Sequence, residues 1–232
     1  MLESKNKVFD FSTSVNDVWR LLNAQERKLL RENASILYFK KNQKIYSEGE
    51  VPQYLMCLLK GKVKIYKDGI GGRSQIIRVI RPVQYFAYRA YFAQENYQTD
   101  AMAFEASTVC MVPLSLFIDL LKNNFNLCQF LIKQLSVDLG IADERTVNLT
   151  QKHIRGRLAE ALVFLIDNYG LEEDKAINIY LAREDLANLS NMTTSNAIRT
   201  LSTFVIEKVI VLDGRKIKIL DEEKLRKISL LG

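Results

Sequence analysis

Residues 182–201 read AREDLANLSNMTTSNAIRTL, a pattern that predicts two short helices joined by a tight turn. Asn191 falls at the turn, where the backbone often needs a left-handed conformation that Asn tolerates better than most residues. Thr193 follows at the position of an N-cap, with a hydroxyl that can accept a hydrogen bond from the first turn of the second helix. The segment therefore predicts a helix-turn-helix.

The second of these helices has two distinct faces. Its inward face is apolar and consists of Ala197, Leu201, Phe204 and Val205. Its outward face carries short polar groups and one guanidinium, on Thr194, Ser195, Asn196 and Arg199. Side chains of these types can read base edges in the major groove of DNA.

A β-hairpin is predicted directly after the two helices. Residues 209–212 and 216–219 are rich in Val and Ile, and the Asp213-Gly214 pair between them is a strong hairpin signal. This hairpin would be the wing of a winged helix-turn-helix. We expect further DNA contacts from Arg215 and Lys216 on the wing and from Thr193 and Arg183 at the helix starts. The alternative is an ordinary helical hairpin packed on a small sheet.

Short β-prone runs separated by Gly and Pro dominate the first half of the chain. They cover residues 36–39, 54–59, 62–66, 74–80 and 102–112, and helices are predicted at 15–33 and 114–122. Such spacing predicts an antiparallel β-roll and not alternating βαβ units. The fold class is therefore α+β, with a β-roll domain at 1–124, a long helix and hinge at 125–150, and a winged-helix domain at 151–232. Within the last domain we expect a helix at 154–169 and a strand at 177–181.

The long helix carries an apolar stripe that recurs mostly every four residues. Its members are Leu127, Leu131, Leu135, Leu139 and Ala142. The stripe either packs on the β-roll or pairs with its twin across a two-fold axis. We favour pairing, because a stripe this long exceeds what one small domain can cover. The sequence thus predicts a homodimer.

Composition narrows the class of protein. Hydrophobic residues make up 48% and charged residues 26% of 232 residues, an ordinary balance for a globular protein. No apolar run approaches the ~20 residues of a membrane span, and no export signal follows Met1, so we expect a cytoplasmic protein without membrane contact. Cysteines 57, 110 and 128 lack metal-ligand spacing and are expected to be buried, reduced thiols. We expect no metal and no cofactor.

Net charge is +6, but residues 151–232 hold 13 Lys and Arg against 12 Asp and Glu, a balance of only +1. DNA affinity would therefore depend on where individual basic side chains lie and not on a strongly basic domain.

The order β-roll, long helix, hinge and winged helix resembles the Crp–Fnr family of bacterial transcription regulators. The matching motifs are Gly49 and Gly61 in the roll, residues 156–159 (GRLA), residues 183–187 (REDLA) and the wing residues 213–217 (DGRKI). The resemblance covers nearly the whole chain. It implies a homodimer whose winged helices are reoriented on DNA when a small-molecule effector binds the β-roll. It also implies RNA polymerase as a further partner.

The chain departs from that family at its ligand positions. Relatives that bind cyclic nucleotides have a Gly-Glu pair where this chain has Ala87-Tyr88, and an Arg-Ser pair where it has Thr99-Asp100. Without a cation for the phosphate, cyclic AMP is not the expected effector. Likewise, the family's Arg-Glu pair on the recognition helix is replaced by Thr194-Ser195, so the operator should differ from the usual half-site.

An aromatic segment offers a different effector pocket. The residues proposed to line it are Tyr85, Phe86, Tyr88, Arg89, Thr99 and Asp100, with Arg89 available for an anionic group. The alternative is a packed roll core with surface tyrosines.

The function predicted is that of a sequence-specific, effector-controlled transcription regulator. The competing function is a ligand- or protein-binding module that has kept the fold without DNA binding. No catalytic residue is predicted, because the single histidine, His153, lies at the hinge and no motif for nucleophilic or metal catalysis is present.

Overall fold

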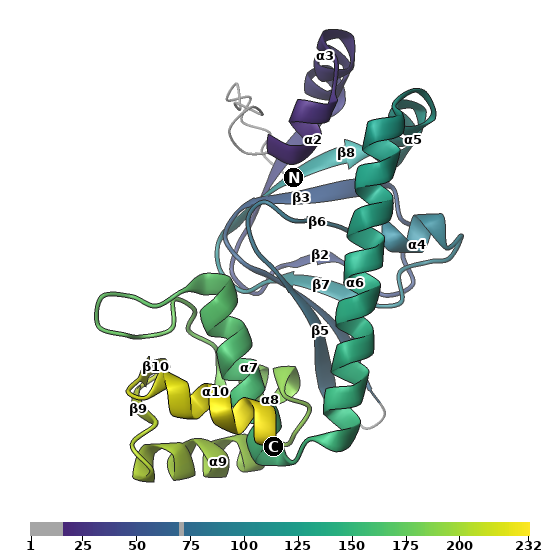
Figure 1. Cartoon of the computed structure of the whole chain (residues 1–232). Coiled ribbons are helices and arrows are strands. Elements are labelled where there is room, and N and C mark those ends of the chain that lie inside the picture. The colour runs from purple at the N-terminus through teal and green to yellow at the C-terminus, as the bar shows by residue number, and fades with distance from the viewer. Residues whose placement is uncertain (1–15, 70–71) are drawn as a thin grey trace. The chain divides into compact units, whose positions relative to one another are not determined.

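The structure is a computed structural model that describes residues 16–69 and 72–232 (Figure 1). Contacts divide the described chain into two compact units. The N-terminal unit holds the residues up to Lys67 together with Ile77–Leu139, and the C-terminal unit holds Asp68–Ile76 together with Gly140–Gly232. The division falls inside the long helix α6 (Phe125–Gln151). The sequence predicted three segments, at residues 1–124, 125–150 and 151–232, and these boundaries remain a prediction.

Two four-stranded sheets build the β-roll. The first has the order β1-β8-β3-β6 and the second β2-β7-β4-β5. The strand bounds are β1 Ser35–Phe39, β2 Lys44–Tyr46, β3 Tyr54–Lys60, β4 Val63–Asp68, β5 Ser74–Ile80, β6 Tyr85–Phe86, β7 Asp100–Ala103 and β8 Ser107–Pro113. The described pairings are antiparallel, which confirms the predicted roll. The run predicted at 102–112 is in fact β7 and β8, and the short β2 and β6 were not expected.

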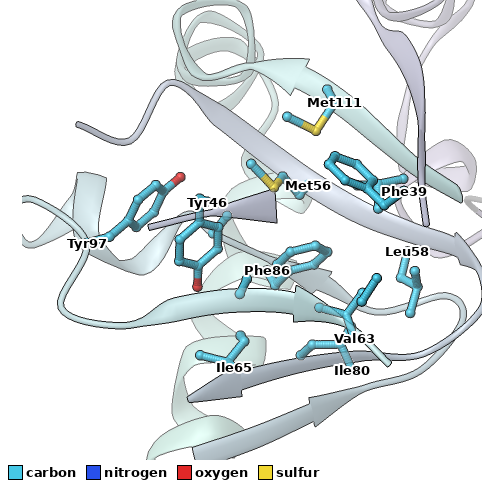
Figure 2. Close-up of a cluster of buried hydrophobic side chains, with 14 of the residues drawn as sticks. Phe39, Tyr46, Met56, Leu58, Val63, Ile65, Ile80, Phe86, Tyr97 and Met111 are labelled. Atoms are coloured by element: carbon cyan, nitrogen blue, oxygen red, sulfur yellow. The ribbon is translucent and has the colours of Figure 1, made fainter. Parts of the chain in front are cut away.

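The alternation of side chains on β3 produces two separate cores. Met56 and Leu58 point into a cluster between the two sheets, which Figure 2 shows with Phe86 and Tyr46. Leu55 and Cys57 point the other way, into a second cluster that includes residues of α5 (Leu114–Asn123) and the start of α6. Successive residues of a strand face opposite sides of its sheet, so one strand serves both cores.

The helix predicted at 15–33 is two helices. Val15 lies outside the described residues, and the rest forms α2 (Asn16–Leu21) and α3 (Ala24–Asn33). Asn23 restarts the helix through a capping box: its side chain accepts from the Glu26 N–H at 2.9 Å, and Glu26 accepts from the Asn23 N–H at 2.8 Å. A short helix, α4 (Arg89–Phe92), follows β6.

The C-terminal unit is a winged helix-turn-helix. It contains α7 (Ile154–Tyr169), α8 (Arg183–Leu189), α9 (Thr194–Ile206), the hairpin β9 (Ile210–Asp213) and β10 (Lys216–Ile219), and α10 (Glu222–Leu231). The strand predicted at 177–181 is wrong. Isolated bridges at Ile177 and Ala176 take its place.

The turn before α9 forms as the sequence predicts. Asn191 has a φ of 49°, and the Thr193 hydroxyl accepts from the Asn196 N–H at 3.2 Å. Ala197, Leu201 and Phe204 are fully buried, whereas Val205 is 38% exposed. Val205 was predicted to face inward, but it lies 100° around the helix from Phe204 and falls outside the buried stripe.

Two features complete the description of the chain. No helix among the described residues is long and apolar enough to cross a membrane, and these residues contain no group of three or more potential metal ligands. Cys57 and Cys110 are buried and Cys128 is half-buried, all three as free thiols.

Gly61 gives a test of the roll's packing. Its φ is +94°, and a Cβ there would lie 2.7 Å from the Ala106 carbonyl oxygen and 2.8 Å from the Ser107 Cα. Gly49 also has a positive φ, +87°, but a Cβ there would meet nothing within 4 Å. Gly49→Ala should lower the free energy of unfolding by about 1–2 kcal/mol through backbone strain. Gly61→Ala should cost an additional ~1–3 kcal/mol through overpacking, measured by denaturant unfolding. Equal losses in the two variants would contradict this account.

Candidate nucleic-acid interface and effector domain

The exposed side of α9 carries the residues proposed to read DNA. Ser195 and Arg199 are exposed, and Thr194 and Asn196 are half-buried, on a helix whose start is fixed by the Thr193 cap. Thr193 is itself exposed, but its hydroxyl is used in that cap.

Arg199 is available for a ligand. The acid that could have neutralised it, Glu207, is instead held by Arg155 through two hydrogen bonds of 2.8 and 2.6 Å. These bonds, followed by the nearby charges of Arg155 and Lys224, keep the pKa of Glu207 below its ordinary value. Among the described residues no carboxylate forms an ion pair with Arg199.

Sequence reasoning missed one side chain on this helix. Ile198 is 49% exposed, although it is apolar, and it lies three positions after Ser195 and next to Arg199. The signal was present, since position 198 falls outside the buried stripe of Ala197, Leu201 and Phe204. We call Thr194, Ser195, Asn196, Ile198 and Arg199 together the recognition face.

Arg183 fastens the wing to the first helix of the motif. Its guanidinium donates to the Gly214 carbonyl oxygen at 2.8 Å. Gly214 and Arg215 form the two-residue loop between β9 and β10, and only Gly214 has a positive φ, 58°, as in a type II′ turn. Arg183 therefore positions the wing, a role that the sequence did not predict.

Lys216 lies among acidic groups. Its ammonium is 3.2 Å from Glu172 and 4.0 Å from Asp174, and it lies 5.1 Å from the centroid of the Tyr180 ring. Hydrogen bonding with Tyr180 and then with Glu172 raises the pKa of Lys216. Lys218 likewise pairs with Asp174, at 2.9 Å. The expected phosphate contact of Lys216 thus starts from an amine that is already paired, whereas Arg215 at the wing tip is exposed.

The six residues proposed to line an effector pocket do not surround one cavity. Phe86 is 1% exposed in the cluster between the sheets, and Tyr88 is 3% exposed in the cluster beneath the helices. Tyr85 is half-buried and meets Phe130 of α6 edge to face. Arg89 is exposed and pairs with Glu95 at 2.6 Å. The structure therefore contradicts a common pocket and favours the packed core that was the alternative.

Asp100 and Thr99 lie where the resemblance implied a phosphate site. The Asp100 carboxylate is 2.8 Å from the Lys44 ammonium and also faces the Glu48 N–H at 3.4 Å, and its side chain is 7% exposed. The Thr99 hydroxyl lies 3.4 Å from that of Tyr46. Ala87, where the family has glycine, keeps a glycine-like φ of 69°. Ala87 thus keeps the backbone conformation of a glycine, while Thr99 and Asp100 offer no cation for a phosphate.

A small cavity does occur on the other side of β3. It measures about 10 Å³ and lies in the cluster beneath the helices, with Val18, Leu30, Leu55, Cys57, Tyr85, Cys110, Val112, Phe117 and Leu120 around it. Its lining is apolar and its volume would hold one water at most. Burial raises the pKa values of the Cys110 thiol, to about 12, and of the Cys57 thiol, so both are inert apolar groups.

An ion pair that the sequence did not predict joins the roll to α6. Arg78 of β5 donates two hydrogen bonds to Asp138 of α6, at 2.8 and 2.9 Å. Tyr88 lies near the pair, and burial, followed by the charge of Asp138, raises its pKa to about 12. Paired hydrogen bonds between a guanidinium and a carboxylate fix geometry as well as charge, so this pair contributes to the orientation of α6 on the roll.

In this orientation, part of the apolar stripe that was predicted to form the dimer is buried against the roll. Leu127 is fully buried and Leu131 is 6% exposed, because both pack into the cluster beneath the helices. Leu135 is half-buried against the same cluster, while Leu139 is 63% exposed and Ala142 is exposed. The first two residues are thus wrong as interface residues. Phe125 and Ile132, which lie outside the predicted stripe, are 73% and 58% exposed.

Comparison with known proteins agrees with this architecture. The family model described as a cyclic nucleotide-binding domain matches residues 36–124, and that of a Crp-like helix-turn-helix domain matches residues 156–228. Among curated proteins, a CRP-like cAMP-activated global transcriptional regulator of Mycobacterium tuberculosis is 22% identical over 81% of this chain and 84% of its own length. Electron transport regulator A of Shewanella oneidensis is 24% identical over 82% of this chain and 76% of its own.

Solved structures show the same fold. FixK2 from Bradyrhizobium japonicum superposes with a TM-score of 0.76 at 21% identity, over 84% of this chain and 96% of that one. A transcriptional regulator of the Crp/Fnr family from Eubacterium rectale gives 0.77 at 17% identity, over 92% and 98%. With a cyclic-nucleotide-binding type of β-roll followed by a Crp-like helix-turn-helix, the chain belongs to the Crp–Fnr family of transcription regulators.

Proposed function

We propose that this chain is a homodimeric, sequence-specific DNA-binding transcription regulator, active in the cytoplasm and controlled by an effector that binds its β-roll unit. The observation that carries the proposal is the recognition face, where Arg199, which has no ion pair with any described residue, stands beside Ser195 and Asn196 on a capped helix. Helix-turn-helix proteins present such a helix to the major groove. Selecting bound fragments from genomic DNA, with and without candidate small molecules, tests the proposal.

The dimer is proposed to form along an exposed ridge of α6. Phe125, Ile132 and Leu139 are seven residues apart, and the half-buried Leu135 and exposed Ala142 lie between and beyond them. A repeat of seven is the spacing of a two-stranded coiled coil. We propose a second copy of α6 as the occupant, because the ridge is apolar and repeats every seven residues along one side of the helix.

Regulation, and not catalysis, is the role that the residues favour. His153, the one histidine, is exposed at the N-cap position of α7 and makes no capping hydrogen bond through its side chain. Contact with RNA polymerase would be needed if the bound dimer activates transcription.

A module without DNA binding is the second candidate. The observation in its favour is the pairing of Lys216 and Lys218 with Glu172 and Asp174, which removes positive charge from the wing. Retention on DNA at increasing salt separates the two functions. A regulator that contacts phosphates loses affinity steeply as salt rises, whereas a module without DNA function shows no such slope.

Leu139→Asp should dissociate the dimer. Each dimer would place two carboxylates in an apolar seam and lose two leucines, each worth about 1.5–3 kcal/mol when buried. Sedimentation at micromolar concentration should show a monomer. Ile141→Asp is the matched control, because Ile141 is also exposed on α6 but points 200° away, and this variant should remain dimeric. A dimeric Leu139→Asp variant would disprove this interface.

Arg199→Ala should lower affinity for a selected operator by roughly tenfold to a hundredfold and relax the preference at one base pair per half-site. The physical reason is the loss of a bidentate contact to guanine. Competition binding against single-base operator variants measures both effects.

Arg215→Ala is the control for this effect. The exposed wing arginine would contact phosphate, so its loss should weaken all sequences alike and reduce the salt slope by about one. An Arg199→Ala protein that folds and binds as selectively as the parent would show that α9 does not read the operator.

Cyclic AMP should not bind at micromolar concentration. The cyclic phosphate would meet the Asp100 carboxylate, whose neutralising partner Lys44 is already bound to it, and a buried charge without a partner costs several kcal/mol. Calorimetry should show no binding heat for the parent. The double variant Thr99→Arg, Asp100→Ser should gain affinity. Micromolar binding by the parent would overturn the expectation.

A further inference from the structure

One large apolar side chain interrupts the polar recognition face. Ile198 is 49% exposed and takes no part in the buried stripe of α9. Isoleucine is also a poorer helix former than alanine. Exposed apolar side chains are common on this chain, so what distinguishes Ile198 is its place among the polar residues of the recognition face.

The neighbouring hydroxyls narrow the set of side chains that can reach a base. The Ser202 hydroxyl donates to the Ile198 carbonyl oxygen at 3.1 Å, and the Thr203 hydroxyl donates to the Arg199 carbonyl oxygen at 3.2 Å. Both groups are turned back onto the helix. The recognition face, which includes Ile198, projects from the N-terminal half of α9. In helix-turn-helix proteins this half of the recognition helix reaches the base edges.

Ile198 lies within that face, about 40° around the helix from Thr194 and about 60° from Ser195. With 3.6 residues per turn, Ser195 and Arg199 are its neighbours one turn back and one step on. A side chain at this place meets a base edge adjacent to the one that Arg199 reads. It can neither donate nor accept a hydrogen bond, so a polar base edge opposite it would lose water without compensation.

The major-groove base edges offer one apolar group, the C5-methyl of thymine. We infer that Ile198 packs on a thymine methyl in each half-site, so that the operator requires thymine next to the base pair read by Arg199. This inference rests on the proposed function and adds a base preference to it.

The experiment removes the methyl without changing any hydrogen bond. In a selected operator, each thymine is replaced in turn by deoxyuridine, and binding of the full-length protein is measured. One position per half-site should lose about fourfold in affinity, the worth of one buried carbon. The same replacement should have no effect on Ile198→Ala and a smaller effect on Ile198→Val.

Val205→Ala is the matched control, since Val205 is 38% exposed on nearly the same side of α9 but lies seven residues after Ile198, outside the N-terminal half that reaches base edges. It should respond to deoxyuridine as the parent does. If the parent binds its operator and no replacement distinguishes it from Ile198→Ala, this inference is wrong while the proposed function stands. If the parent binds no DNA specifically, both are wrong.

Discussion

The apolar residues on both faces of β3 and β8 are the constraint on which the rest of the structure depends. Met56 and Leu58 close the roll from within, while Leu55 and Cys57 provide the surface that α5 and the first turns of α6 cover. Because Leu127 and Leu131 are used on that surface, Phe125, Ile132 and Leu139 are left exposed on another side of α6. The Arg78–Asp138 pair contributes to the same orientation of α6 from a second point. The position of the exposed apolar ridge on α6 is thus a consequence of the alternation of side chains on β3.

Sequence alone predicted those parts of the structure whose signals are local. The turn at Asn191, the Thr193 cap and the Asp213-Gly214 hairpin each depend on residues a few positions apart, and each formed as expected. The break at Asn23 carried a local signal too, the Asn23 and Glu26 pair of a capping box, which the long amphipathic pattern obscured.

What sequence could not predict depends on contacts between distant segments. The choice between Leu127 and Ile132 as interface residues requires knowing which side of α6 the roll covers. Lys216 and Glu172 are 44 positions apart, and Lys44 and Asp100 are 56 apart, so their pairing needed the fold. Tyr85 and Tyr88 pack in one core and Phe86 in the other, and composition cannot distinguish that from a pocket lining.

The wing is held by a contact with a main-chain atom. Arg183 donates to the carbonyl of Gly214, a group that every amino acid possesses. Replacements at the neighbouring Arg215 can therefore alter the charge at the wing tip while the hairpin keeps its place. Under the proposed function, general attraction to DNA and preference for an operator can change separately in evolution, because Arg215 lies in the wing loop and Arg199 lies on α9.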